Sequence, residues 1–311
     1  MTESTAQSQR ILTSHNRFDY QPIIGRPDYC WPDGNRLAVY IGFNVEHFEF
    51  GGGLGAKLAP SNEPDVLNYA WREYGNRVGA WRCLDLFSEL DIPVGALINT
   101  ALYDHAPQLM DAFRARGDEI IGHGHTNADR QNMVDEAAER ALIASCTERI
   151  TAIEGVAPRG WLSPWIAESA TTPDLLQECG YHYTLNWCHD DQPMPMATRN
   201  GSLWAIPYPQ ELNDIPMLAA RQMDIAPFVR MIEDQFDEML RQSAHQPLVM
   251  GIALHPYLVG QPYRLKVLRE ALKAIRRRGN AWWTTPGEIC THVQSIDVLQ
   301  NLGLSRWHGI A

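Results

Sequence analysis

Three residues with acid–base side chains, Glu46, His123 and His255, each stand directly after an apolar run of the sequence. A carboxylate and two imidazoles can take up and release protons near neutral pH, as hydrolysis of an amide-type bond requires. A lone histidine at the end of a strand is more often structural than catalytic, and a lone acid there often caps a helix. Because all three residues occupy the same kind of position, we interpret them as one shared site.

Further polar and aromatic residues follow the apolar runs and are candidates for binding a substrate. The predicted binding residues are Asn44, His125, Arg159, Trp165, Trp187 and Tyr257. The aromatic rings would wall a pocket, with packing in the core as the alternative for the tryptophans. Arg159 would either hold a substrate carboxylate or pair with Asp190 or Asp191, and we favour the pairing.

The elements that must bring these residues together are predicted from apolar periodicity. Eight strand-like runs span residues 37–45, 94–99, 119–122, 159–162, 181–187, 203–208, 248–254 and 281–285. Helical periodicity is clearest over 225–240, and further helices are predicted over 78–90 and 264–278. Apolar strands that alternate with amphipathic helices are typical of a parallel sheet covered by helices. We expect an α/β fold, a distorted barrel of seven to eight parallel strands, with an open doubly wound sheet as the alternative.

Composition limits the partners and the number of domains. The 311 residues contain no repeat or low-complexity linker, which predicts an N-terminal arm (1–35), one barrel domain (36–295) and a C-terminal tail (296–311). A formal charge of −11 disfavours nucleic acid and anionic membrane surfaces as partners. The absence of a secretory signal pattern predicts a cytoplasmic protein. Six cysteines without a CxxC pair are expected to be reduced.

Several segments, taken in order, resemble the polysaccharide deacetylase superfamily. They resemble most the branch that contains cofactor-independent allantoinase and cyclic imide hydrolase. The resemblance covers residues 31–293, nearly the whole chain. The segments that carry it are 31–39 (WPDGNRLAV), 44–46 (NVE), 119–127 (EIIGHGHTN), 159–165 (RGWLSPW), 190–193 (DDQP) and 254–262 (LHPYLVGQP).

The resemblance also implies roles for individual residues. In metal-dependent members one Asp is the base, a second Asp and a His-x-x-x-His pair hold a divalent metal, and a late His is the acid. By position these roles fall on Asn44, on Glu46 with His123 and Asn127, and on His255. Asn44 cannot accept a proton at neutral pH, and the amide of Asn127 is a poor ligand for zinc. We therefore expect no cofactor. The alternative is a zinc ion held by Glu46 and His123 together with either Asn127 or His125.

The expected function is hydrolysis of a non-peptide C–N bond in a small cyclic amide or imide. Glu46 would be the base or would orient the water, with its pKa raised by a semi-buried pocket. Asn127 would donate to a substrate carbonyl, and His123 and His255 would share the acid and base roles in an order that the sequence does not decide. The alternatives are a zinc-dependent deacetylase of N-acetyl sugars and a catalytically dead binding protein. By analogy with related small-ring hydrolases, we expect a homodimer or homotetramer.

Overall fold

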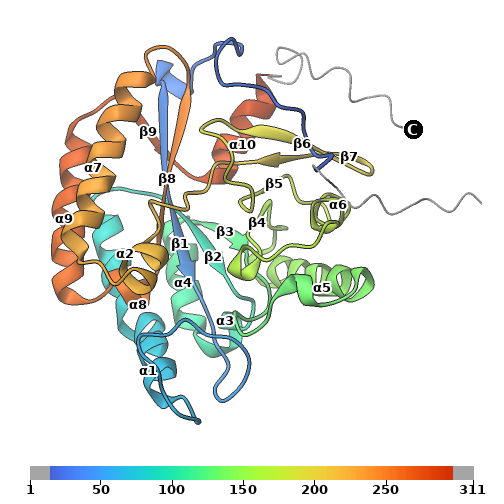
Figure 1. Ribbon diagram of the computed structural model, residues 1–311, viewed down its shortest axis with the longest axis vertical. Helices are drawn as coiled ribbons and strands as arrows, with labels where there is room; N and C mark the ends of the chain where they lie inside the picture. Colours follow the sequence, from blue (N-terminus) through green and yellow to red (C-terminus); the bar gives the residue numbers. More distant parts are fainter. Residues whose placement is uncertain (1–14, 297–311) are drawn as a thin grey trace, which may run out of the picture.

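The computed structural model describes residues 15–296, and within that range nine strands form one curled sheet (Figure 1). The strands run in the order β6-β7-β5-β4-β3-β2-β1-β8, and β9 pairs with β1. Their bounds are β1 (Leu37–Val45), β2 (Val94–Ile98), β3 (Glu119–Gly122), β4 (Gly160–Trp161), β5 (Tyr183–Thr184), β6 (Met194–Thr198), β7 (Gly201–Ala205), β8 (Leu248–Leu254) and β9 (Ala281–Thr284).

Strand β1 is the centre of the sheet, and every one of its residues is buried. One edge of β1 pairs with β8 along Leu37 to Phe43. Its other edge pairs first with β9, along Leu37 to Tyr40, and then with β2, along Ile41 to Val45. These pairings are parallel, and so are those that connect β2 to β3, β3 to β4, β4 to β5 and β5 to β7. The sheet is therefore the predicted distorted α/β barrel, built as an incompletely closed half-barrel.

The eight predicted strands all form, and a ninth, β6, was not predicted. β6 pairs antiparallel with β7 at the edge of the sheet. Its sequence contains Pro195, which cannot donate to a strand ladder and which argues against a strand in the middle of a sheet. An edge strand tolerates proline, but the sequence pattern did not show that residues 194–198 would lie at the edge of the sheet.

Ten helices surround the sheet within the described residues. They are α1 (Val66–Tyr74), α2 (Ala80–Glu89), α3 (Leu102–His105), α4 (Pro107–Arg116), α5 (Glu136–Glu154), α6 (Thr172–Glu178), α7 (Ile225–Gln242), α8 (Pro256–Val259), α9 (Pro262–Arg277) and α10 (Pro286–Ser295). A π-helical turn, Gly75–Gly79, joins α1 to α2, and a second, Ile215–Ala220, precedes α7. Figure 1 shows α7 and α9 side by side on one flank of the sheet. None of these helices is long and apolar enough to cross a membrane.

The described part of the N-terminal arm packs against the barrel. Trp31 is buried, and its indole N–H donates to the carbonyl of Leu248 at 3.0 Å. Arg17 forms a buried salt bridge with Asp174 at 2.7 Å. Residues 1–14 of the predicted arm and 297–311 of the predicted tail lie outside the described residues. The proposed division of the chain therefore stays a prediction.

Candidate active site

The carboxyl ends of β1, β3 and β8 place Glu46, His123 and His255 next to one another. Nε2 of His123 lies 3.7 Å from Oε1 of Glu46, and Nε2 of His255 lies 3.6 Å from the same oxygen. All three side chains are buried. The parallel sheet explains this convergence, because strands that run in one direction end at one edge. The structure thus brings together the three residues that the sequence grouped.

The carboxylate of Glu46 is held by neutral donors as well as by the imidazoles. The side-chain amide of Asn127 donates to Oε1 at 2.7 Å, and the hydroxyl of Tyr257 donates to Oε2 at 3.0 Å. Burial acts to raise the pKa of Glu46, but His255 and His123 outweigh it and lower this pKa to about 2. The expectation of a raised pKa was wrong, because the sequence did not show how many positive and donor groups would surround the carboxylate.

His255 forms a buried pair with Asp214, a residue that the sequence analysis missed. Nδ1 of His255 lies 2.6 Å from Oδ1 of Asp214, and the backbone N–H of His255 donates to Oδ2 at 2.7 Å. Burial opposes a charge on His255, but Asp214 and Glu46 outweigh burial and raise its pKa to about 10. His255 is therefore an imidazolium at neutral pH.

Asp214 reaches this position through an irregular segment beside β8. Asn213 forms an isolated parallel bridge with Ala253, and the N–H of Ala253 donates to the carbonyl of Leu212 at 2.9 Å. The segment has no strand periodicity, so nothing in its sequence indicated that it runs along the sheet. The available signal was an acid in an apolar setting, between Leu212 and the Ile215-Pro216 pair.

His123 has a fixed tautomer when its ring is neutral. Its Nδ1 lies 2.7 Å from the carbonyl oxygen of Leu162, which can only accept, so Nδ1 carries the hydrogen. Nε2 is buried and has no hydrogen-bond partner among the described residues. In the neutral ring this atom presents a lone pair beside Glu46.

These groups line a cavity of about 300 Å³. The predicted residues Asn44, Asn127, Trp165 and Tyr257 line it too, together with Tyr208, whose hydroxyl lies 3.0 Å from Nδ2 of Asn44. Along another side of this cavity, Trp165 and Ile166 adopt consecutive left-handed backbone conformations, with φ of 63° and 53°. The indole N–H of Trp165 donates to the carbonyl of Asn127 at 2.9 Å.

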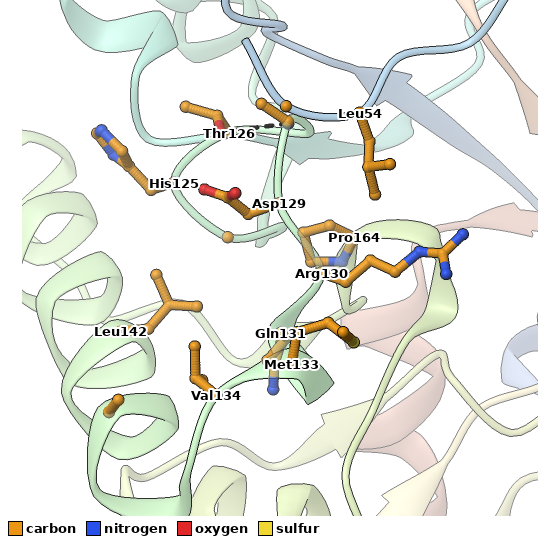
Figure 2. Close-up of a pocket in the computed structure, with 14 residues that line it drawn as sticks. Leu54, His125, Thr126, Asp129, Arg130, Gln131, Met133, Val134, Leu142 and Pro164 are labelled. Atoms are coloured by element: carbon orange, nitrogen blue, oxygen red, sulfur yellow. Dashed lines mark hydrogen bonds between the residues drawn. The ribbon is translucent and has the colours of Figure 1, made fainter.

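His125 does not share this cavity. Gly124 adopts a φ of +70°, which turns the chain, and His125 lies on the wall of a second cavity of about 640 Å³ (Figure 2). There the ring nitrogen Nδ1 lies 3.0 Å from the hydroxyl of Thr100. The prediction that His125 binds the substrate beside His123 therefore does not agree with the structure.

Arg159 and Trp187 also lie away from the candidate site. Arg159 precedes β4, at the opposite end of the sheet, and donates to the carbonyl of Gly287 at 2.8 Å. The predicted pairing with Asp190 or Asp191 was wrong, because Arg159 donates to Gly287 and Thr291 instead, and Arg26 occupies Asp190 at 2.6 Å.

Trp187 follows β5 but turns away from the cavity. Its indole N–H donates to Glu168 at 2.6 Å, and its ring packs edge-on against Phe18 of the N-terminal arm. The arm, which the sequence did not position, thus packs against the indole that we had assigned to a substrate.

The residues that the family resemblance assigns to a metal fit a zinc ion poorly. The candidate ligands are one carboxylate, one imidazole and the neutral amide of Asn127, whose nitrogen donates to Glu46. Catalytic zinc sites usually have three strong protein ligands, a number that this set does not reach.

Comparison with known proteins connects this geometry to one family. Residues 73–184 match the family described as polysaccharide deacetylase. The peptidoglycan deacetylase of Helicobacter pylori is 24% identical over 289 residues, which cover 81% of this chain and 94% of that protein.

Two solved structures are similar over nearly their whole length. An allantoinase structure superposes with a TM-score of 0.78 at 26% identity, covering 89% of this chain and 98% of that one. A Pseudomonas aeruginosa PAO1 protein assigned as a polysaccharide deacetylase gives a TM-score of 0.76 at 26% identity, covering 88% and 98%. Similarity alone does not separate the two activities.

Proposed function

We propose that this chain opens the ring of a small cyclic amide or imide without a metal. It belongs to the polysaccharide deacetylase superfamily and is a hydrolase of carbon–nitrogen bonds other than peptide bonds. The observation that carries the proposal is the charge arrangement of the cavity. Glu46 is ionised beside an imidazolium at His255, which Asp214 holds, and the neutral amide of Asn127 stands where a metal site would need a second imidazole ligand.

Activation of water is assigned to His123 with Glu46. Nε2 of His123 and Oε1 of Glu46 are 3.7 Å apart, a separation that a water molecule can bridge by donating one hydrogen to each. His123 takes the proton as the water oxygen attacks the substrate carbonyl carbon, and Glu46 holds the other hydrogen. We assign Glu46 to orientation because a carboxylate with a pKa of about 2 is a weak base.

Departure of the ring nitrogen is assigned to His255. Its Nε2 faces the cavity, while Nδ1 donates to Asp214. As the tetrahedral intermediate collapses, the C–N bond breaks and Nε2 of His255 gives its proton to the nitrogen. The products are a carboxylate and an N–H group on one opened chain. Asn44 lines the same cavity and can donate to a substrate carbonyl.

The test is a turnover screen with allantoin, hydantoin, succinimide and N-acetylglucosamine oligomers, each with and without a chelator. Ring opening is measured by chromatography of the product. We expect at least one cyclic substrate to be opened, with no loss of activity when the chelator is present. Glu46→Gln and His123→Gln should each lower kcat/KM on the order of 10²-fold. His182→Gln, which changes an exposed histidine beside β5, is the matched control and should keep full activity.

One observation favours a second candidate, a zinc-dependent deacetylase. Nε2 of His123 and Oδ1 of Asn127 are both buried without a hydrogen-bond partner among the described residues, so both are free to bind an added group. Release of acetate from the sugar oligomers, abolished by chelator and restored by zinc, would establish this candidate in place of ours. Absence of turnover with every substrate would support a binding protein.

A further inference from the structure

A second cluster of titratable side chains lies outside the candidate active site. His47 follows β1, Glu73 lies in the last turn of α1, and His105 ends α3. One ligand atom from each lies within 4.8 Å of the others, and Nε2 of His105 is 2.8 Å from Oε1 of Glu73. Glu73 and His105 line a small cavity of about 230 Å³ that is separate from the active-site cavity.

A simple ion pair between Glu73 and His105 does not account for His47. Nδ1 of His47 is buried and has no hydrogen-bond partner among the described residues, and buried polar atoms rarely lack one. The ring centre of His47 lies 4.4 Å from that of His105. Two imidazoles held this closely, with a carboxylate oxygen within 4.8 Å of both, gain a common partner if a cation binds.

Arg77 is the charged neighbour that could compete with a cation. Its Nε lies 3.2 Å from Oε2 of Glu73, but its side chain is 76% exposed, so solvent weakens the pairing. The other carboxylate oxygen, Oε1, faces His105. Oε1 of Glu73 can therefore bind a metal while Oε2 stays paired with Arg77.

We propose that His47, Glu73 and His105 bind one zinc ion. Two imidazoles and one carboxylate form a ligand set used by zinc, and a water molecule can enter from the exposed side of His105 as the fourth ligand. Zinc–ligand bonds of about 2 Å place the ligand atoms roughly 3.3 Å apart. Nε2 of His105 and Oε1 of Glu73, 2.8 Å apart, therefore need to separate slightly, and the ligand atoms that lie up to 4.8 Å apart need to approach, both by side-chain rotation.

The zinc ion would stabilise the segment that carries Glu46 without taking part in the reaction. It would join the loop after β1 to α1 and α3. The same segment is already held by Asn76, which donates to the carbonyl of Glu46 at 2.9 Å, and by Asn99, which accepts from the N–H of His47 at 2.8 Å. The inference does not depend on the proposed function, because none of the three ligands lines the active-site cavity.

The experiment measures metal content and the absorption spectrum of cobalt in the full-length protein. After treatment with chelator and addition of zinc, we expect one equivalent of zinc per chain and a higher Tm. Substitution with Co²⁺ should give the visible absorption bands of a tetrahedral site. His105→Gln and Glu73→Gln should each lower zinc affinity at least tenfold and remove the rise in Tm, whereas the exposed His245→Gln should change neither.

A further variant separates this site from a metal in the catalytic cavity. His123→Gln should keep the zinc and the cobalt spectrum. Loss of zinc in His123→Gln but not in His105→Gln would place the metal in the catalytic cavity and overturn the inference, and so would the absence of stoichiometric zinc in the unmodified protein. Any chelator effect on activity that persists in His105→Gln would count against the metal-free function instead.

Discussion

His255 keeps its proton at neutral pH because Asp214 and Glu46 lie beside it. In Asp214→Asn the imidazolium loses its hydrogen-bonded carboxylate, so the pKa of His255 should fall toward its ordinary value of about 6.5. If His255 is the acid, kcat/KM should fall on the order of 10²-fold, and the alkaline limb of its pH profile should move to lower pH. The measurement is kcat/KM against pH for both proteins. An alkaline limb that stays in place would remove His255 from this role.

The same two residues predict how stability depends on pH. The pKa of His255 is raised in the folded state, so its contribution is complete below about pH 6.5 and is lost as pH rises toward about 10. The pKa of Glu46 is lowered, so its contribution is complete above about pH 4.5 and is lost as pH falls toward about 2. The free energy of unfolding in urea should therefore fall on both sides of this window. In His255→Gln the alkaline decline should become shallower.

Single residues were predictable where they follow a regular element. Glu46, His123 and His255 each come directly after a buried strand, so the end of that strand determines where they lie. Asp214 was not predictable, because it depends on a contact between an irregular segment and β8. The lowered pKa of Glu46 was missed although the sequence grouped it with His123 and His255, because the sequence did not show how close the two imidazoles lie to the carboxylate.

At the scale of elements, the π-helical turn Gly75–Gly79 packs directly against α8, which follows His255 and carries Tyr257. A methyl group on Gly79 would collide with the carbonyl oxygen of Pro256. Gly79→Ala should lower the free energy of unfolding by about 1–3 kcal/mol and reduce kcat by displacing Tyr257.

Urea unfolding and steady-state kinetics measure both effects of Gly79→Ala. Gly52→Ala is the control, because an added methyl group there meets its nearest atom, Oε2 of Glu49, at an ordinary 3.6 Å. Equal behaviour of the two variants would show that the close packing of the turn against α8 has no role in the site.

Long apolar strands were the easiest elements to predict. Strands β1 and β8 begin and end where their apolar runs do, because burial on both faces leaves a continuous apolar sequence. The run over 181–187 forms only the two-residue strand β5. Periodicity also could not show the change to a π-helical turn before α2, which depends on close contact with α8.

At the scale of the whole molecule, Arg17 connects the N-terminal arm to the barrel through Asp174. Arg17→Met would leave Asp174 buried without its cation and should lower the free energy of unfolding by about 3–5 kcal/mol. Arg149→Met, which removes an exposed pair with Asp104, should change it by less than about 1 kcal/mol. Urea unfolding of both variants is the measurement. Similar small losses would mean that the arm adds little to the stability of the fold.

The class of fold could be predicted because strands and helices alternate along the chain. The attachment of the arm could not be predicted, since Arg17 and Asp174 are 157 positions apart and Arg17 lies in no helix or strand. The same holds for Trp187, whose position became clear only with Phe18 beside it.

The wall of the cavity formed by the turn at Trp165 and Ile166 is less rigid than the wall formed by the ends of β1 and β8. Left-handed conformations at non-glycine residues cost on the order of 1 kcal/mol or more each, and here one indole hydrogen bond helps to offset that cost. The wall at the ends of β1 and β8 is held by the hydrogen bonds of the sheet. We therefore expect a slightly larger substrate to be accommodated by a conformational change of the turn at Trp165 and Ile166. Tolerance should be greatest for bulk that points toward Trp165 and least for bulk that points toward Asn44.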